Sequence, residues 1–468
     1  GINAALNTKD ENDSPEEHFT DTIKAACGLA DPNAVWGMTQ AAPELVHWLL
    51  KLGVKFNMSG YDDVDLRNFG GQKKKRTAFA QSDTGKQIMT AMIDAVRRKE
   101  ASGMVERVSH HSFLTLSLCG NICCGCVIRD EYSQETVELP GDAVIVATGG
   151  MHGLFGNTTG SLSNTGEVTA ELFRLGVPLA NGEMIQYHPT TVKCGGKRML
   201  ISEAARGEGG RLFAMKDGKQ WYFMEEKYPE LGNLMPRDTT AREIWKVSHE
   251  SEVFLDMTEI SEEIISNKLS GLADDCMTYL HKDIRKEPVS VLPGIHYFMG
   301  GILVDEQHRT PIQNLCAAGE CCAQYHGANR LGGNSLLGAL YGGRVAAKSA
   351  CEQADVVDLS CATQIDFPPA SQISEIKQLN KVMQETMGVV RNENTLLNGI
   401  QTVQALTGNL PLLGMAVLKS ALARKESRGA HWREDYPKSN DDDYLKTTVA
   451  RFDGKQIQIS FVPVPERR

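Results

Sequence analysis

HGANRLGGNSLLGALYGGR, residues His326–Arg344, is the stretch on which the interpretation of this chain depends. Its glycines and alanines are dense, and missing side chains let a backbone approach a sheet or a ligand closely. A polar turn with Arg330, Asn334 and Ser335 precedes an apolar, helix-like run at 336–347. Such a turn offers unpaired N–H groups and a positive dipole end, so it predicts an anion or cofactor site. A tight strand-to-helix turn without a ligand is the alternative.

Two short apolar runs end on small and polar residues. Residues 143–147 lead into Thr148-Gly149-Gly150, and residues 315–319 lead into Glu320. β-branched runs that close on glycine are typical of buried parallel strands, whose carboxyl ends deliver loops to a cofactor. These loops and the glycine-rich stretch therefore predict one shared site.

The rest of the chain mixes helical and strand signals. Ser14 followed by Pro15 predicts a helix start. Alternating residues predict a small meander with strands at 104–108, 113–118, 124–129 and 135–139. Further helices are expected at 43–52, 83–98, 168–175, 259–280, 373–387, 396–406 and 412–424, with a last strand at 456–462.

Composition excludes several classes of protein. The 468 residues are 41% hydrophobic and 23% charged, as in soluble globular proteins. A net charge of −10 argues against a nucleic-acid partner, and no apolar run reaches the roughly 18 residues of a membrane span. Cys123 and Cys126 have C-x-x-C spacing, but no second pair completes a metal site, so buried inert thiols are expected and a redox role is the alternative. A cytoplasmic, reducing compartment fits best.

Polar side chains on several loops suit a small dicarboxylate. Arginine binds carboxylates through two parallel hydrogen bonds, and histidine and serine can complete a second carboxylate site. Each residue alone has an ordinary structural explanation, such as an ion pair between Arg237 and Asp238. Their occurrence together beside two cofactor loops favours binding by His188, Ser202, Arg237, His296 and Arg330.

An ordered set of motifs resembles the flavoprotein subunits of fumarate reductase and succinate dehydrogenase. The set covers essentially the whole chain: QYHPT (186–190), SEAARGEGG (202–210), MPRD (235–238), HYFMGGI (296–302), AAGE (317–320), HGANRLGGNSLL (326–337) and SRGAHWREDYPKSNDDDYLK (427–446). The related flavoenzyme L-aspartate oxidase has a similar glycine-rich run and is the second enzymatic hypothesis.

The resemblance implies an α/β fold, α+β overall. A Rossmann-like FAD-binding domain (1–181 and 297–357) is interrupted by an α+β capping domain (182–296). A C-terminal helical domain (370–430) and a tail (431–468) follow. Interconversion of fumarate and succinate in electron transport and anaerobic respiration is then expected. The implied partners are an iron–sulfur subunit and a membrane-anchor subunit on the cytoplasmic face of the inner membrane.

The resemblance also implies roles for single residues. Arg237 falls on the proton donor or acceptor, with Glu203 and Arg206 as its proton relay. His188, Ser202, His296 and Arg330 fall on dicarboxylate ligands. The positions that touch FAD in the family correspond to Thr148, Gly149, Gly150, Glu167, Glu320, Ser335 and Leu336.

One family feature is missing from the sequence. The family opens with G-x-G-x-x-G, which places the pyrophosphate on a helix N-terminus, and this chain has no such motif. The upstream histidine that attaches FAD covalently in membrane-bound members is also missing. We expect an N-terminal truncation of about forty to fifty residues, the size of a βαβ-type start, and weak FAD binding. An inactive remnant is the third hypothesis.

Overall fold

The two apolar runs form a parallel pair of strands, β7 (Val144–Val146) and β17 (Leu315–Ala317). Val144 pairs with Leu315 and Val146 with Ala317, so both strands end at the same edge. The helix α10 (Asn334–Gln353), which the glycine-rich stretch opens, packs against both strands. The computed structural model describes residues 1–468 apart from 10–11, 62, 354–364, 366 and 368–371.

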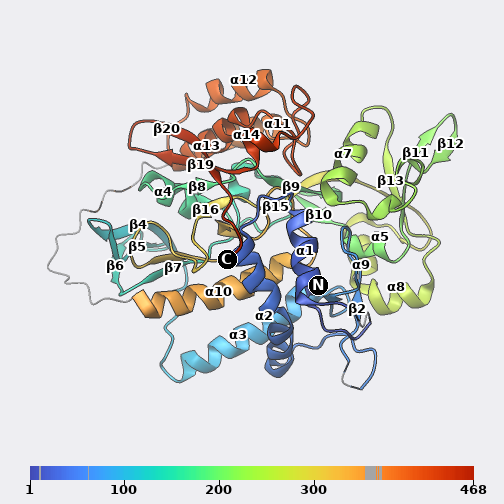
Figure 1. Cartoon of the computed structure of the whole chain (residues 1–468), viewed down its shortest axis with the longest axis horizontal. Coiled ribbons are helices and arrows are strands. Elements are labelled where there is room, and N and C mark those ends of the chain that lie inside the picture. The colour runs from blue at the N-terminus through green and yellow to red at the C-terminus, as the bar shows by residue number, and fades with distance from the viewer. Residues whose placement is uncertain (10–11, 62, 354–364, 366, 368–371) are drawn as a thin grey trace.

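The N-terminal region packs beside α10 at the bottom of Figure 1. Ser14 accepts a hydrogen bond from the Glu17 N–H at the start of its first helix, as predicted. The second helix is longer than the predicted 43–52, because Asp31 caps it and Pro32 occupies its first turn. The elements are β1 (Ile2–Asn3), α1 (Pro15–Ala25), α2 (Pro32–Leu52), β2 (Leu66–Arg67), β3 (Thr77–Ala78) and α3 (Thr84–Ala101).

An antiparallel meander, at the left of Figure 1, follows α3. It consists of β4 (His111–Cys119), β5 (Ile122–Asp130) and β6 (Thr136–Pro140). The predicted strand at 104–108 is wrong: these residues are exposed, and no strand of the described chain pairs with them. After β7 come the 3-10 turn η1 (His152–Leu154), the helix α4 (Glu167–Arg174) and β8 (Leu179–Ala180).

Within residues 182–298, the segment from β11 to α9 lies at the right of Figure 1 and packs around a buried cluster that includes Leu212 and Leu255, whereas β9 and β15 lie nearer the centre. The predicted helix 259–280 breaks at Leu269, which leaves helical geometry (φ −127°) while burying its side chain. The strands are β9 (Ile185–Cys194), β10 (Lys197–Leu200), β11 (Arg211–Lys216), β12 (Lys219–Trp221), β13 (Val253–Asp256), β14 (Val289–Ser290) and β15 (Leu292–Phe298). The helical segments are α5 (Glu203–Gly207), α6 (Phe223–Lys227), η2 (Gly232–Leu234), α7 (Arg237–Val247), α8 (Glu262–Lys268), α9 (Ser270–Asp275) and the π-helix η3 (Cys276–Leu280).

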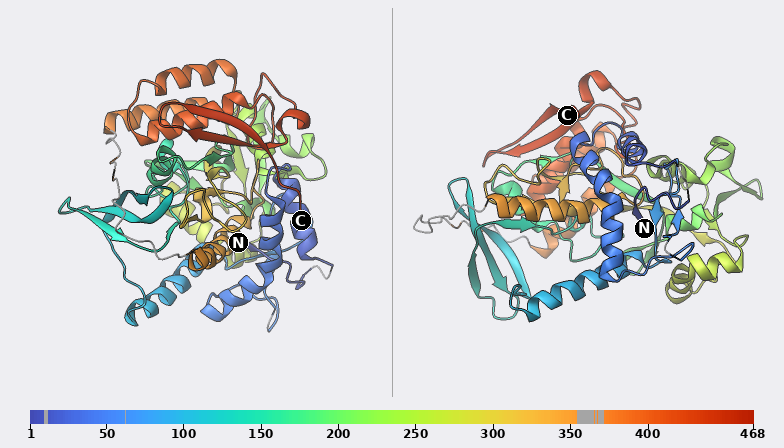
Figure 2. Two further views of the ribbon diagram at one scale, coloured as in Figure 1. Left: turned by 60° about the vertical axis from the view of Figure 1, so that its left-hand side comes forward. Right: turned by 60° about the horizontal axis from the view of Figure 1, so that its bottom comes forward.

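The chain then returns to the first region and ends in a helical layer, at the top of Figure 1. Helix α13 packs against α4 and α12. Strand β19 lies between β8 and β20 in a sheet of order β18-β16-β8-β19-β20, of which the sequence predicted only the last strand. Figure 2 shows the C-terminal arm running back toward α2, where Asn33 binds the Glu466 carbonyl. The elements are β16 (Gly301–Leu303), η4 (Gly319–Cys321), β18 (Cys322–Ala323), α11 (Ile373–Thr386), α12 (Glu393–Val403), α13 (Asn409–Ala423), α14 (Asp441–Tyr444), β19 (Lys446–Phe452) and β20 (Ile457–Pro463).

Parts of two predicted domains, residues 354–357 and 370–371, lie outside the described residues. None of the helices that the structure describes combines the length and apolarity that a bilayer span requires.

Candidate functional site

Strand β9 carries the first polar side chains of the site. Gln186, His188 and Thr190 alternate along it, so they share one face of the strand. All three are buried, with Gln186 fully inaccessible. Strand β15 pairs with β9 and brings His296 beside His188, with ring centroids 5.2 Å apart and edge to face.

A buried ion cluster lies between α5 and α7. Glu203 Oε2 accepts hydrogen bonds from Arg237 Nε at 2.8 Å and Nη2 at 2.6 Å. Glu203 Oε1 accepts from the Gly70 N–H at 2.9 Å and lies 3.8 Å from Arg206 Nη2. The structure therefore brings the three predicted catalytic side chains into one contiguous group.

Gln186 joins this cluster to the glycine-rich stretch. Its Oε1 accepts from Arg237 Nη1 at 3.1 Å and from Arg330 Nε at 3.2 Å. Arg330 also donates to Ser335 Oγ at 2.9 Å and stacks over the Tyr297 ring at 4.5 Å. Arg237 and Arg206 thus face one carboxylate, Glu203, and Arg330 joins the group through Gln186, so the group has an excess of positive charge that suits a dianion.

His188 presents one unpaired ring nitrogen to the site. Its Nδ1 lies against the main chain of Thr190, 3.2 Å from the N–H and 3.1 Å from the carbonyl oxygen. Its Nε2 is buried and has no partner among the described residues. Nδ1 therefore faces a donor and an acceptor at similar distances, so this contact is compatible with either tautomer, and in one of them Nε2 carries the proton. That proton needs an acceptor such as a carboxylate oxygen.

Burial sets the charge states of these groups. It lowers the pKa of His188 well below 6.5, helped by Arg237 and Arg206, and it does the same for His296, helped by His188 and Arg237. Burial, with Arg237, lowers the pKa of Arg330 to about 9. Burial alone would raise the pKa of Glu203, but its two arginine neighbours and its hydrogen bonds outweigh this and lower it. Both imidazoles are therefore neutral at pH 7 and Glu203 is ionised.

A cavity of about 370 Å³ opens onto this cluster. Its walls come from α1, the loop 68–73, the start of α7 and the glycine-rich stretch. The charged residues among them are four cations and one acid: Lys24, Lys73, Arg237, Arg330 and Asp238. The predicted ligands His188, Ser202 and His296 do not line this cavity. The cavity has the size and the charge for a small dicarboxylate.

Ser202 has a second task besides any ligand. Its hydroxyl accepts the Ala204 N–H at 3.2 Å and so caps α5. A hydroxyl has one donor hydrogen and two acceptor sites, so its O–H remains able to donate to a ligand. The cap also places Glu203 at the first position of the short helix that carries Arg206.

Most of the predicted cofactor residues lie near the carboxyl edge of β7 and β17. Thr148 is exposed there, and Gly150 is so close to Glu320 that a Cβ on it would lie 2.8 Å from Oε1. Ser335 and Leu336 lie in the first turn of α10. Glu167 is exposed at the start of α4, and its side chain forms no hydrogen bond or ion pair within the described part of the chain.

These residues fit the flavin end of an FAD molecule. Gly149 adopts the left-handed conformation (φ +73°), so the turn after β7 keeps close to the strand edge. The α10 N-terminus and Arg330 supply positive potential, while Glu320 and Ser335 supply hydrogen-bonding groups. The given sequence contains no G-x-G-x-x-G turn, so these residues are compared with the flavin part of FAD and not with its pyrophosphate.

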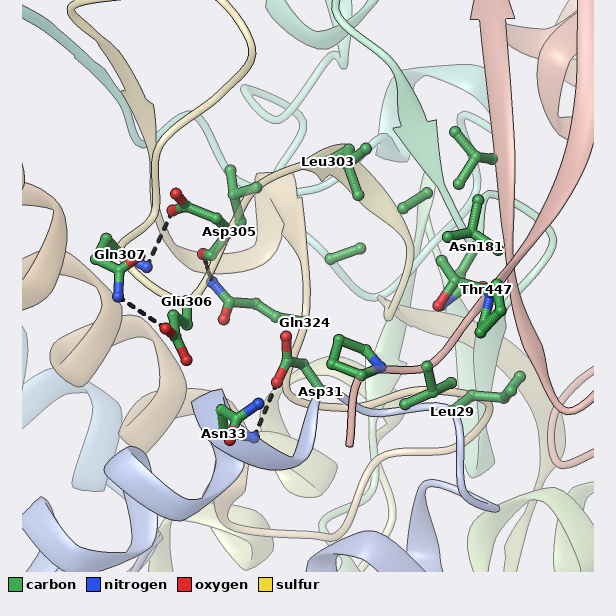
Figure 3. Close-up of a pocket in the computed structure, with 18 of the residues that line it drawn as sticks. Leu29, Asp31, Asn33, Asn181, Leu303, Asp305, Glu306, Gln307, Gln324 and Thr447 are labelled. Carbon is green, nitrogen blue, oxygen red and sulfur yellow. Dashed lines mark hydrogen bonds between the residues drawn. The ribbon is translucent and has the colours of Figure 1, made fainter. Parts of the chain in front are cut away.

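A second cavity, of about 470 Å³, lies near the C-terminal arm. Figure 3 shows that its acidic side chains already have partners. Asp31 accepts from the Asn33 N–H, Asp305 from the Gln307 N–H, and Glu306 from the Gln307 side chain. No group of His, Cys, Asp or Glu within the described ranges is arranged to hold a metal ion. The arginine-lined cavity is therefore the better candidate for the functional site.

The sequence missed Gln186 and Gly70, which touch the ion cluster directly. The signal for Gln186 was its period-two spacing to His188, because polar residues on a buried strand face need partners. No local signal marks Gly70, since its N–H reaches Glu203 across 133 positions of sequence.

Comparison with known proteins places this geometry in context. A family model for an FAD binding domain matches residues 1–336, and one for the fumarate reductase flavoprotein C-terminus matches residues 406–467. The succinate dehydrogenase flavoprotein subunit of Bacillus subtilis is 36% identical, with 100% of this chain and 90% of that protein covered. L-aspartate oxidase of Nostoc sp. is 31% identical, with 96% and 86% covered. The solved structure of an E. coli quinol fumarate reductase variant has a TM-score of 0.89 at 26% identity, covering 99% of this chain and 88% of that one.

Proposed function

The chain belongs to the succinate dehydrogenase and fumarate reductase flavoprotein family of FAD-dependent oxidoreductases, and from that membership we propose that it interconverts fumarate and succinate. The family models and the relatives confirm both the family and the FAD cofactor that the motifs predicted. One observation carries the proposal: three buried arginines lie together with a single carboxylate, Glu203, which contacts two of them, beside two neutral histidines. That arrangement is complementary to a dicarboxylate dianion.

Substrate binding divides between two ends of the site. Arg330 holds one carboxylate, because its guanidinium is pinned by Gln186 and Ser335 and keeps donors for a ligand. His188 Nε2–H, His296 and the Ser202 hydroxyl hold the other carboxylate. Clamping both ends fixes the carbon–carbon bond and excludes water from the reacting atoms.

FAD, when bound, supplies or accepts a hydride at one carbon of the substrate. Arg237 gives a proton to the other carbon in the direction of fumarate reduction and takes it back in succinate oxidation. An arginine is a weak acid, with a free pKa above about 12. Its proton must therefore be replaced at once, and Glu203 lies 2.6 Å from its Nη2. Arg206, 3.8 Å beyond Glu203, continues the relay.

The assembly follows the family as well. We propose an iron–sulfur partner subunit that exchanges electrons with the flavin, and a membrane-anchor subunit that places the complex on the cytoplasmic face of the inner membrane. We also propose the domain division stated above, with the lobe at 182–296 as the capping domain over the dicarboxylate site.

L-aspartate oxidase activity is the second candidate. Its support is the 31% identity to the Nostoc enzyme, comparable with that to several fumarate reductases. L-aspartate carries an ammonium group, which a cluster with excess positive charge disfavours. We therefore place fumarate and succinate ahead of L-aspartate as substrates.

The decisive experiment measures fumarate reduction by the purified holoenzyme with a reduced viologen dye, and succinate and L-aspartate oxidation with an oxidised dye. We expect turnover of fumarate and succinate but not of L-aspartate. Arg237→Ala should abolish turnover, while Arg242→Ala, on the same helix but stacked on Trp432, should retain it. Equal rates in Arg237→Ala and the parent would refute the assignment of the acid.

A further inference from the structure

Two consecutive threonines between η1 and α4 bind two different histidines. Thr158 Oγ1 lies 2.8 Å from His152 Nδ1, and Thr159 Oγ1 lies 2.7 Å from His296 Nδ1. One histidine adjoins the flavin edge and the other belongs to the dicarboxylate site. The dipeptide therefore connects both halves of the site, although no family role described above uses it.

The Thr158 arm leads to a carboxylate. His152 is 4% exposed, and its Nε2 lies 3.6 Å from Glu320 Oε1. The same oxygen accepts the Phe298 N–H at 3.0 Å, and the Phe298 ring packs edge-on against His152 at 4.9 Å. Glu320 can only accept, so a proton on His152 Nε2 faces it, and with Nδ1 unprotonated that atom accepts from the Thr158 hydroxyl.

The Thr159 arm leads to the substrate. Its hydroxyl fixes the ring plane of His296, which lies edge to face with His188. A neutral imidazole that binds a ligand through one nitrogen is oriented by the hydrogen bond at its other nitrogen. Thr159 thus decides how His296 presents Nε2 to a carboxylate.

Main-chain hydrogen bonds hold this segment in addition to its hydroxyl contacts. The Thr159 N–H donates to the Ile295 carbonyl, and the Arg198 N–H donates to the Thr158 carbonyl, both at 3.0 Å. A threonine-to-valine change keeps the side-chain shape and these main-chain bonds. At Thr159 it removes the contact with His296. At Thr158 it removes the contact with His152 and the hydrogen bond that Oγ1 accepts from the Gly160 N–H at 3.3 Å, which serine would keep, so each arm can be tested separately.

We propose that Thr158 and Thr159 are positioning residues for two different groups. Thr158, through His152, sets the carboxylate of Glu320 at the flavin edge, and Thr159 sets His296 for the dicarboxylate. The inference rests on the proposed function, because it takes the substrate to be a dicarboxylate. It goes beyond that function by assigning the coupling of the two subsites to one dipeptide.

Two measurements on the purified holoenzyme test this proposal: the flavin midpoint potential without substrate, and malonate affinity by calorimetry. Thr158→Val should change the oxidised-to-reduced equilibrium of the flavin about tenfold, near 30 mV for a two-electron couple, and leave malonate affinity unchanged. Thr159→Val should weaken malonate binding about tenfold, the usual effect of losing one buried hydrogen bond, and leave the potential unchanged. Thr158→Ser and Thr159→Ser keep the hydroxyl and should restore the parent values.

The outcomes separate the two levels of inference. Parent protein that binds no malonate refutes the proposed function itself. Parent protein that binds malonate, combined with valine variants that alter both quantities alike or neither, overturns only the division of roles between the two threonines. Serine variants that behave like the valine variants also overturn it, because the hydroxyl is then irrelevant.

Discussion

Replacing Glu203 by glutamine tests both the stability and the chemistry of the ion cluster. Glu203→Gln keeps the shape of the side chain and removes its charge. In the parent protein the Glu203 carboxylate accepts two hydrogen bonds from Arg237 and one from the Gly70 N–H, and it faces Arg206. An amide has one acceptor oxygen, so its NH₂ group must face either Gly70 or Arg237, both of which are donors.

The cost to stability follows from burial. Glu203 is 3% exposed and Arg237 is 8% exposed. Removing one partner of a buried ion pair costs about 3–5 kcal/mol, because the remaining charge stays uncompensated. Glutamine still accepts one hydrogen bond, so we expect the free energy of unfolding to fall by about 3 kcal/mol at pH 7. Malonate should recover part of this loss, since it brings two negative charges to the same arginines.

The pH dependence has a defined sign. The folded-state pKa of Glu203 lies below its ordinary value. The stability that it contributes is therefore fully present above the pKa of an exposed glutamate, about 4.3, and is lost as pH falls through the lower folded-state pKa. The difference in the free energy of unfolding between the parent and Glu203→Gln should be largest at neutral pH and should shrink in acid.

The assays are urea unfolding and dye-linked fumarate reduction. If Glu203 returns the proton to Arg237, its loss lowers the rate by about 10²–10⁴-fold. Glu208→Gln is the matched control, because Glu208 binds Lys268 near the surface, and it should cost less than about 1 kcal/mol. The reasoning is refuted if Glu203→Gln unfolds within 1 kcal/mol of the parent or reduces fumarate within about tenfold of its rate.

Three further predictions concern other groups. Malonate affinity should stay level between pH 6 and 8, because both histidines are neutral there. It should fall about tenfold per pH unit above pH 9, where Arg330 loses its proton in the free protein. Calorimetry across this pH range measures the affinity. Gln186→Leu removes the acceptor shared by Arg237 and Arg330, and leaving their N–H groups unpaired, at about 1–3 kcal/mol, should raise the KM for fumarate about tenfold in steady-state kinetics. Arg424→Leu leaves the fully buried Glu183 without its ion-pair partner, so urea unfolding should show a loss of about 3–5 kcal/mol.

Each of these predictions has an outcome that contradicts it. Malonate binding that strengthens below pH 7 would show that a histidine gains a proton on binding. A Gln186→Leu variant with unchanged KM would mean that the arginines hold their positions without the shared oxygen. Arg451→Leu, at an exposed position, is the control for Arg424→Leu, and equal losses in the two would remove the buried network as the cause.

Local sequence predicted most of the secondary structure around the site. Ser14 capped its helix, and the apolar runs before Thr148 and Glu320 became paired parallel strands. These signals succeed because capping and β-branched runs act through neighbours in the chain. The failures were of another kind. Residues 104–108 have strand-like alternation but no pairing strand within the described chain, and Leu269 broke a helical pattern to reach the core.

The residue types of the site were predictable, but their contacts were not. Arg237 and Arg330 were both singled out, yet nothing in their neighbourhoods indicated that they meet on one oxygen of Gln186. Thr158 and Thr159 carried no signal, because a pair of threonines in a loop is ordinary. Glu167 matched the family pattern, and its exposed side chain forms no hydrogen bond or ion pair with the described residues, so its role stays a prediction.

The sequence by itself determined which chemical groups this protein has and their order along the chain. The ordered motifs identify the family, and the glycine-rich stretch from His326 to Arg344 supplies both a cation and a helix start. Only the tertiary structure decided how those groups act together. The pKa of Arg330 falls to about 9 and Glu203 stays ionised because burial removes water and distant segments supply the neighbouring charges. Chemical identity is local to a residue, whereas its charge state and its partners depend on packing between residues far apart in the chain.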